Sequence, residues 1–167
     1  MSRMIECMSR PDFYPHRPTT VEIFQTHISF VFIAGDDVYK VKKPVNFGFL
    51  DFTSLEKRKF YCEEELRLNR RLAPSIYLNV TPITRNEQGE FSLNGSQEVV
   101  DYAVRMKRLP QEVMLKNLLS RGNADAKVMD AVAKKIARFH QEAETGGAID
   151  QMGSIQTIRH NHEENFA

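Results

Sequence analysis

The sequence predicts an α+β fold, with an antiparallel sheet of about five strands and one long helix, followed by further helices. Segments rich in β-branched and aromatic residues, separated by turn-forming glycine and asparagine, recur through the first 110 residues. One capped helical segment, residues 53–72, interrupts them. Beyond Pro110 the apolar residues recur at helical spacing instead.

Composition limits the classes of function. The chain has 167 residues and 41% apolar content, which suits one domain or one lobe of a larger one. Its 23 Lys and Arg nearly balance its 22 Asp and Glu, so we expect neither a nucleic acid nor a membrane partner. It lacks an apolar run of about 18 residues and an apolar signal core.

The chain has two cysteines, Cys7 and Cys62, with no metal-type spacing. A disulfide between them is one alternative. Two scattered cysteines are more typical of reduced thiols, so we expect a cytoplasmic protein.

Four segments are expected along the chain. Residues 1–18 contain three prolines and no sustained period, which predicts an irregular arm. Residues 19–110 hold the strands and the long helix, and residues 111–144 hold two apolar helical faces. Residues 145–167 are rich in glycine and polar residues, which predicts a connector or tail.

The strand candidates are bounded by turn residues. Residues 28–34 end at Gly35-Asp36, and residues 37–42 follow, so the two predict a β-hairpin stopped by Pro44. Residues 21–25 are a candidate for a short strand before it. The other strand candidates are separated by turns that contain Asn and Gly, and they are residues 77–83, 91–93 and 99–106.

The long helix is predicted to begin at a capping box, Thr53-Ser-Leu-Glu56, in which the side chains of Thr53 and Glu56 accept each other's backbone amides. Ala73-Pro74 ends it near Leu72.

Two lysines and a glutamate are the candidate functional residues. Lys40 and Lys42 share one face of their strand, because side chains alternate along a strand. Of the run Glu63 to Glu65, only Glu65 falls on the apolar arc of the helix. A carboxylate there needs a cation, and Lys40 is the first candidate and Lys42 the second.

Other interpretations stay open. The strand lysines suit a solvated edge that blocks pairing with another chain. Glu65 can also pair with Asn69 or Arg58 at the rim of the helix. The basic runs 69–71 and 105–108 are candidate phosphate contacts, although such residues are more often solvated.

The sequence holds no strong metal or hydrolase motif. His140, His160 and His162 lack a third ligand at metal spacing, so we expect no metal site in this chain. It has no P-loop, no Gly-x-Ser-x-Gly elbow and no glycine-rich kinase loop. A strand lysine paired with a helix glutamate is, however, how a kinase-like site fixes a cation against ATP phosphates.

Four strings resemble the N-terminal part of the bacterial aminoglycoside-phosphotransferase-like proteins, some of which are fused to a C-terminal P-loop ATPase domain. The strings are Thr26-His-Ile-Ser-Phe-Val-Phe-Ile-Ala-Gly35, Tyr39-Lys-Val-Lys-Lys-Pro-Val-Asn-Phe-Gly-Phe-Leu-Asp-Phe52, residues 62–74, and Tyr102-Ala-Val-Arg-Met-Lys-Arg-Leu-Pro110. The resemblance runs from about Tyr14 to His140.

This resemblance implies a protein-kinase-like N-lobe that binds ATP and, in the complete protein, Mg²⁺. It implies that Lys40 contacts the phosphates with Glu65 as its helical partner. The hinge segment near the adenine would be residues 105–109, with Arg105, Met106, Lys107 and Leu109 as contacts. Residues 111–120 and 125–144 would be the first helices of a C-lobe.

The chain departs from the family in lacking a His-Gly-Asp type catalytic loop and a metal-binding aspartate after it. We therefore expect a nucleotide-binding region without its C-terminal lobe, with no catalytic residue and no turnover alone. Its phosphate acceptor would be an unknown small molecule bound mainly by that lobe. Apolar positions that lack partners in this chain predict self-association, for example as a homodimer, and they include Leu118, Leu119, Ile136 and Phe139. The alternative is a non-enzymatic interaction domain on a kinase-like scaffold.

Overall fold

The computed structural model describes residues 2–164 and residue 166. The chain forms two compact units, Met1–Arg121 and Gly122–Ala167. The first unit combines helices with a six-stranded antiparallel sheet, so the predicted α+β class is confirmed.

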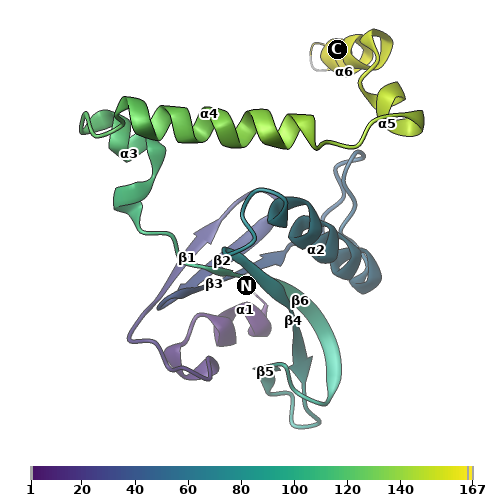
Figure 1. The fold of residues 1–167 in the computed structure, drawn as a ribbon. Coiled ribbons are helices and arrows are strands. Elements are labelled where there is room, and N and C mark those ends of the chain that lie inside the picture. The colour runs from purple at the N-terminus through teal and green to yellow at the C-terminus, as the bar shows by residue number, and fades with distance from the viewer. Residues whose placement is uncertain (1, 165, 167) are drawn as a thin grey trace. The chain divides into compact units, whose positions relative to one another are not determined.

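The sheet has the strand order β1-β2-β3-β6-β4-β5 (Figure 1). Its strands are β1 (Val21–Gln25), β2 (Ser29–Ala34), β3 (Asp37–Lys42), β4 (Tyr77–Arg85), β5 (Phe91–Leu93) and β6 (Glu98–Lys107). All six strand candidates are present, one more than the expected total of about five.

The β2–β3 hairpin is the predicted one. Ala34 pairs with Asp37, and Gly35 between them has φ +63°, a backbone conformation that glycine adopts at no steric cost. The register places Lys40 beside Val31 on β2 and Val104 on β6. The strand that carries the lysines is therefore interior to the sheet, paired on both sides.

Helix α2 (Leu55–Arg70) packs against β6 and β4. Its N-cap is Ser54, whose Oγ accepts from the Lys57 amide at 3.2 Å, so the prediction of Thr53 as the cap is wrong by one residue. The reason is Asp51, which accepts the Thr53 amide at 2.9 Å and its hydroxyl at 2.6 Å. With Thr53 occupied in that turn, the next hydroxyl caps the helix.

The N-terminal segment is not the irregular arm that the prolines predicted. It contains α1 (Arg3–Met8) and a 3₁₀ turn, Pro11–Phe13. Ile5, Met8 and Tyr14 are buried, and the Tyr14 hydroxyl donates to the Met8 carbonyl at 2.6 Å. Alpha-helices of this length are unstable alone, so burial against the sheet explains the helix better than local propensity does.

The hydrophobic core lies on the sheet face opposite the lysines. Tyr39 and Val41 alternate with Lys40 and Lys42 along β3, so they point to the other face. The core cluster joins the N-terminal segment to four strands and consists of Ile5, Met8, Tyr14, Phe32, Ala34, Tyr39, Val41, Ile83 and Ala103. Figure 1 shows α1 and α2 on opposite sides of the sheet.

A 3₁₀ turn (Gln111–Val113) and α3 (Leu115–Ser120) end the first unit. The second unit begins with α4 (Ala126–Gln141), capped by Asp125, whose side chain accepts from the Val128 amide.

The expected connector or tail at residues 145–167 instead contains α5 (Gly147–Met152) and α6 (Ile155–Glu164). Ser154 Oγ accepts from the Thr157 amide at the start of α6, a local capping signal that the glycine-rich composition concealed. None of the helices that the structure describes is both long and apolar enough to cross a membrane.

Candidate functional site

Lys40, Lys42 and Glu65 meet on the α2 side of the sheet. Lys40 Nζ donates to Glu65 Oε1 at 2.8 Å, and Lys42 Nζ donates to Glu65 Oε2 at 2.7 Å. The predicted contact between Lys40 and Glu65 is confirmed. The second candidate lysine makes the contact as well, so one carboxylate joins two strand lysines.

Cys62, one turn before Glu65 on α2, fixes the position of the helix on the sheet and so places Glu65 beside the lysines. Cys62 is fully buried, and its thiol lies 3.8 Å from the Tyr102 carbonyl on β6, which seats the helix on the sheet. Burial raises the pKa of the Cys62 thiol to about 12, so at neutral pH it is a packing group and not a nucleophile.

The environment keeps Glu65 ionised. Burial alone would raise the pKa of this carboxyl, but the hydrogen bonds from Lys40 and Lys42, with their charges, outweigh it and lower the pKa below its ordinary value. Two cations share one anion, so the cluster carries a net charge of about +1. An anion such as a phosphate would complete its charge balance.

A pocket of about 290 Å³ has a strand neighbour of Lys40 in its lining, although neither the two lysines nor Glu65 line it themselves. Val38, two residues before Lys40 on the same strand face, is one of its walls. Tyr77 is another, and the charges of Glu65 and Lys40 both act on the pKa of its hydroxyl, which burial raises. The lining is mainly apolar and consists of Ile33, Val38, Ala73, Ile76, Tyr77, Met106, Lys107, Arg108, Leu109, Gln111 and Met114.

Three of the four predicted hinge contacts line this pocket: Met106, Lys107 and Leu109. The structure does not bring Arg105 there. Its guanidinium binds both oxygens of Asp37, at 2.8 and 3.1 Å, and so ties β6 to β3. Arg105 pairs in register with Tyr39, whose side chain belongs to the opposite face.

The alternative partners proposed for Glu65 have other roles. Arg58 is buried and donates to Asp101 at 2.8 Å and to the carbonyls of Phe52 and Thr53. Asn69 donates to the main-chain carbonyl of Glu65, not to its carboxylate. Sequence reasoning missed the Arg58–Asp101 pair, because 43 residues separate its members and no local pattern links them.

Arginines of the two basic runs, residues 69–71 and 105–108, make contacts that hold elements of the fold together. Arg70 donates to the carbonyl of Tyr77 at 2.8 Å and to that of Leu78, which holds the end of α2 to β4. Arg108 pairs with Glu22 at 2.9 Å. Among the residues that the structure describes, no three His, Cys, Asp or Glu side chains gather as a metal site would require.

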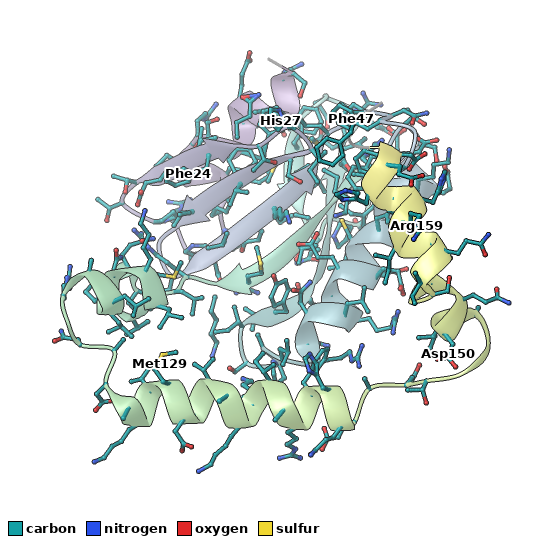
Figure 2. All side chains as sticks on the ribbon, turned by 90° about the horizontal axis from the view of Figure 1, so that it is seen from above. Phe24, His27, Phe47, Met129, Asp150 and Arg159 are labelled. Carbon is teal, nitrogen blue, oxygen red and sulfur yellow. The ribbon has the colours of Figure 1, made fainter. Side chains whose placement is uncertain are left out.

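An exposed aromatic pair follows the strand lysines in the chain. The rings of Phe47 and Phe49 stack at 6.4 Å between centroids, and Phe49 is 88% exposed. With His27 and Ile28 of the β1–β2 turn they line a second pocket of about 380 Å³. Figure 2 shows His27 and Phe47 near each other. Phe47 and Phe49 stand only two residues apart in the sequence, but no periodicity marked them.

Sequence comparison finds relatives in mycobacteria. The chain is 31% identical over 147 residues to Uncharacterized protein Rv2004c of Mycobacterium tuberculosis and to Uncharacterized protein Mb2027c of Mycobacterium bovis. The match covers 88% of this chain and 28% of each relative, so the chain spans less than a third of their length. No family model matches the chain, and neither does any solved structure.

Proposed function

We propose that this chain is the nucleotide-binding, N-terminal region of a kinase-like small-molecule phosphotransferase, similar to the aminoglycoside phosphotransferases. The observations that support the proposal are the Lys40–Glu65 pair and a mainly apolar pocket whose wall includes Val38, two residues before Lys40 on the same strand face. The pocket suits a flat, weakly polar base, and the lysine beside it suits a phosphate.

The proposed roles follow from the geometry. Val38, Met106 and Leu109 would pack against the adenine, with Lys107 at the hinge. Lys40 would donate to a phosphate oxygen, and Glu65 would hold that lysine in place. A hydrogen bond between charged groups contributes about 1.5–3 kcal/mol, so the loss of one of them is measurable as an affinity change.

The reaction also needs a site for the Mg²⁺ that accompanies ATP and a site for a small-molecule phosphate acceptor. Because the match covers 28% of each relative's length, we propose that a C-terminal lobe supplies both sites.

The two free cysteines of this chain, one of them buried, support a cytoplasmic location.

Calorimetric titration with ADP and ATP tests this function. We expect Lys40→Met to weaken binding about tenfold or more, since it removes the cation from the phosphates. Lys134→Met is the matched control, because Lys134 is exposed on α4 and pairs only locally with Asp130. Equal affinity of the Lys40→Met variant and the unaltered protein would contradict the proposal.

The alternative function, a non-enzymatic interaction domain, has a separate support in the exposed pair Phe47 and Phe49, since exposed aromatic pairs often mark contact surfaces. A chain that folds stably and shows no change in melting temperature with any nucleotide would favour it.

We also propose self-association. Met129, Val132 and Ile136 on α4 are all at least 40% exposed, and a second copy of the helix would cover them. Light scattering over a concentration series should show a mass above that of a monomer, which Ile136→Glu should lower. A monomer at every concentration would contradict this.

A further inference from the structure

The site has one cation more than its carboxylate requires. Each oxygen of Glu65 accepts from a different lysine, at 2.8 Å from Lys40 and 2.7 Å from Lys42. One lysine is sufficient to pair a buried carboxylate, so the second is available for another anion. The surroundings of the two amines differ, and they indicate which lysine pairs with Glu65 and which is available for another anion.

Lys42 is enclosed. Its side chain is 5% exposed, and its Nζ lies 4.9 Å from the centre of the Phe52 ring, which is itself buried. A cation between a carboxylate and an aromatic face in a dry setting is held from two sides. To leave Glu65, Lys42 would have to lose both contacts with little access to water.

Lys40 is the more exposed of the two lysines. Its side chain is 28% exposed, and its strand neighbour Val38 lines the pocket wall. Its ammonium group has three donors, and Glu65 Oε1 uses one of them. Lys40 can therefore donate to a ligand in the pocket while it stays near Glu65.

From this asymmetry we propose that Lys42 is a positioning residue that permanently holds Glu65, and that Lys40 alone transfers its hydrogen bonds to the phosphates of a bound nucleotide. The inference rests on the nucleotide-binding function proposed above and deepens it. A single strand lysine would have to share its one positive charge between the carboxylate and the phosphate. Here Glu65 keeps Lys42 as its cation while Lys40 turns, so each anion has a cation when the phosphate arrives.

Two matched double variants separate the lysines. Lys42→Met with Glu65→Gln keeps Lys40, and Lys40→Met with Glu65→Gln keeps Lys42; neither leaves a buried carboxylate without a partner. Both variants lose the carboxylate that holds Lys40, so they are compared with each other. By titration with ADP, we expect the variant that keeps Lys40 to bind about tenfold or more tightly than the variant that keeps Lys42. Equal affinities, or the reverse order, would overturn the proposal.

A readout without nucleotide distinguishes this proposal from the function on which it rests. The carboxyl carbon of Glu65 can be titrated by NMR in single variants. Lys42→Met should raise the pKa of Glu65 more than Lys40→Met does, because the enclosed lysine is the permanent partner. An equal or larger rise in Lys40→Met would overturn the assignment, whether or not ADP binds. If the unaltered protein binds no ADP, the nucleotide-binding function fails, and with it the role given to Lys40.

Folding is checked before either measurement, by circular dichroism and thermal melting of each variant. If Lys42→Met does not fold, Lys42→Gln replaces it in both measurements, since the amide keeps a donor for Glu65 without the charge. The same outcomes then decide the proposal.

Discussion

Helix α2 contributes to two buried ion pairs that respond oppositely to their surroundings. Glu65 faces two lysines, and their hydrogen bonds lower its pKa despite its burial. Asp101 faces one arginine, and there burial prevails, so the pKa of Asp101 is raised although Arg58 and the Tyr102 amide act to lower it. Burial acts to raise the pKa of both carboxyl groups, and the number of cations beside each group decides whether its pKa ends above or below the ordinary value.

The cations of the two sites also differ in how many hydrogen-bond donors they have available for a ligand. Arg58 is occupied by Asp101 and by the carbonyls of Phe52 and Thr53, all parts of the fold. Lys40 donates to Glu65 with one of its three hydrogens, and its strand neighbour Val38 lines a pocket. A saturated pair of this kind stabilises the fold, whereas an unsaturated one has capacity for a ligand.

The largest effect is expected at the saturated pair. Arg58→Met leaves Asp101 buried without its cation, and we expect a loss of about 3–5 kcal/mol in the free energy of unfolding at pH 7. Urea denaturation measures it. The double variant with Asp101→Asn should recover much of the loss, because no charge then stays buried. A loss below about 1 kcal/mol in the single variant would place this pair among ordinary surface pairs.

Acid should separate the two carboxylates. The folded-state pKa of Glu65 is lowered, so its contribution to stability is present above its unfolded pKa of about 4.3 and is lost as the pH falls through the lowered value. Glu65→Gln should therefore cost about 1–3 kcal/mol at pH 7 and progressively less below pH 4. Denaturation at several pH values measures the difference.

The raised pKa of Asp101 has the opposite sign. Its ionised form is disfavoured in the fold, so stability linked to this group is greatest at low pH and declines as the pH rises through the folded pKa.

If the cost of Glu65→Gln stays constant from pH 7 to pH 3, Glu65 is not the group that the lysines hold ionised, and the contrast between the two sites fails.

The smallest effect is expected at Ser29, which pairs in register with Lys42. Its Oγ is buried and has no hydrogen-bond partner among the described residues. Ser29→Ala removes this orphan hydroxyl beside the enclosed Lys42, so we expect no loss and a gain of up to about 1 kcal/mol by urea denaturation. A clear loss would show that the hydroxyl binds something, such as a water molecule.

Local signals predicted the strands of the sheet and one of the two buried ion-pair sites on α2. Alternation along residues 37–42 placed both lysines on one face, and the helical arc selected Glu65 from three adjacent glutamates, because both periods depend only on near neighbours. Alternation alone did not decide between Lys40 and Lys42. The difference between them arises from Phe52 and from the pocket, which are tertiary features.

What the sequence did not predict depends on distant contacts. Arg58 on α2 pairs with Asp101 on β6, and α1 forms where Ile5 and Met8 pack into the core beside the sheet. The prolines of the first segment indicated irregular structure, and they do bound the short elements there. Only packing against the core, which no local pattern encodes, converts this segment into part of the fold.

The buried N-terminal segment has a consequence for how the protein is made. Ile5 and Met8 leave the ribosome well before Ile83 and Ala103, which belong to the same core cluster. Joining residues so far apart is slow, because a long loop must close before its contacts form. Until β6 has been synthesised, the apolar face of α1 lacks part of its core, and in that interval we expect chaperones and proteases to bind it.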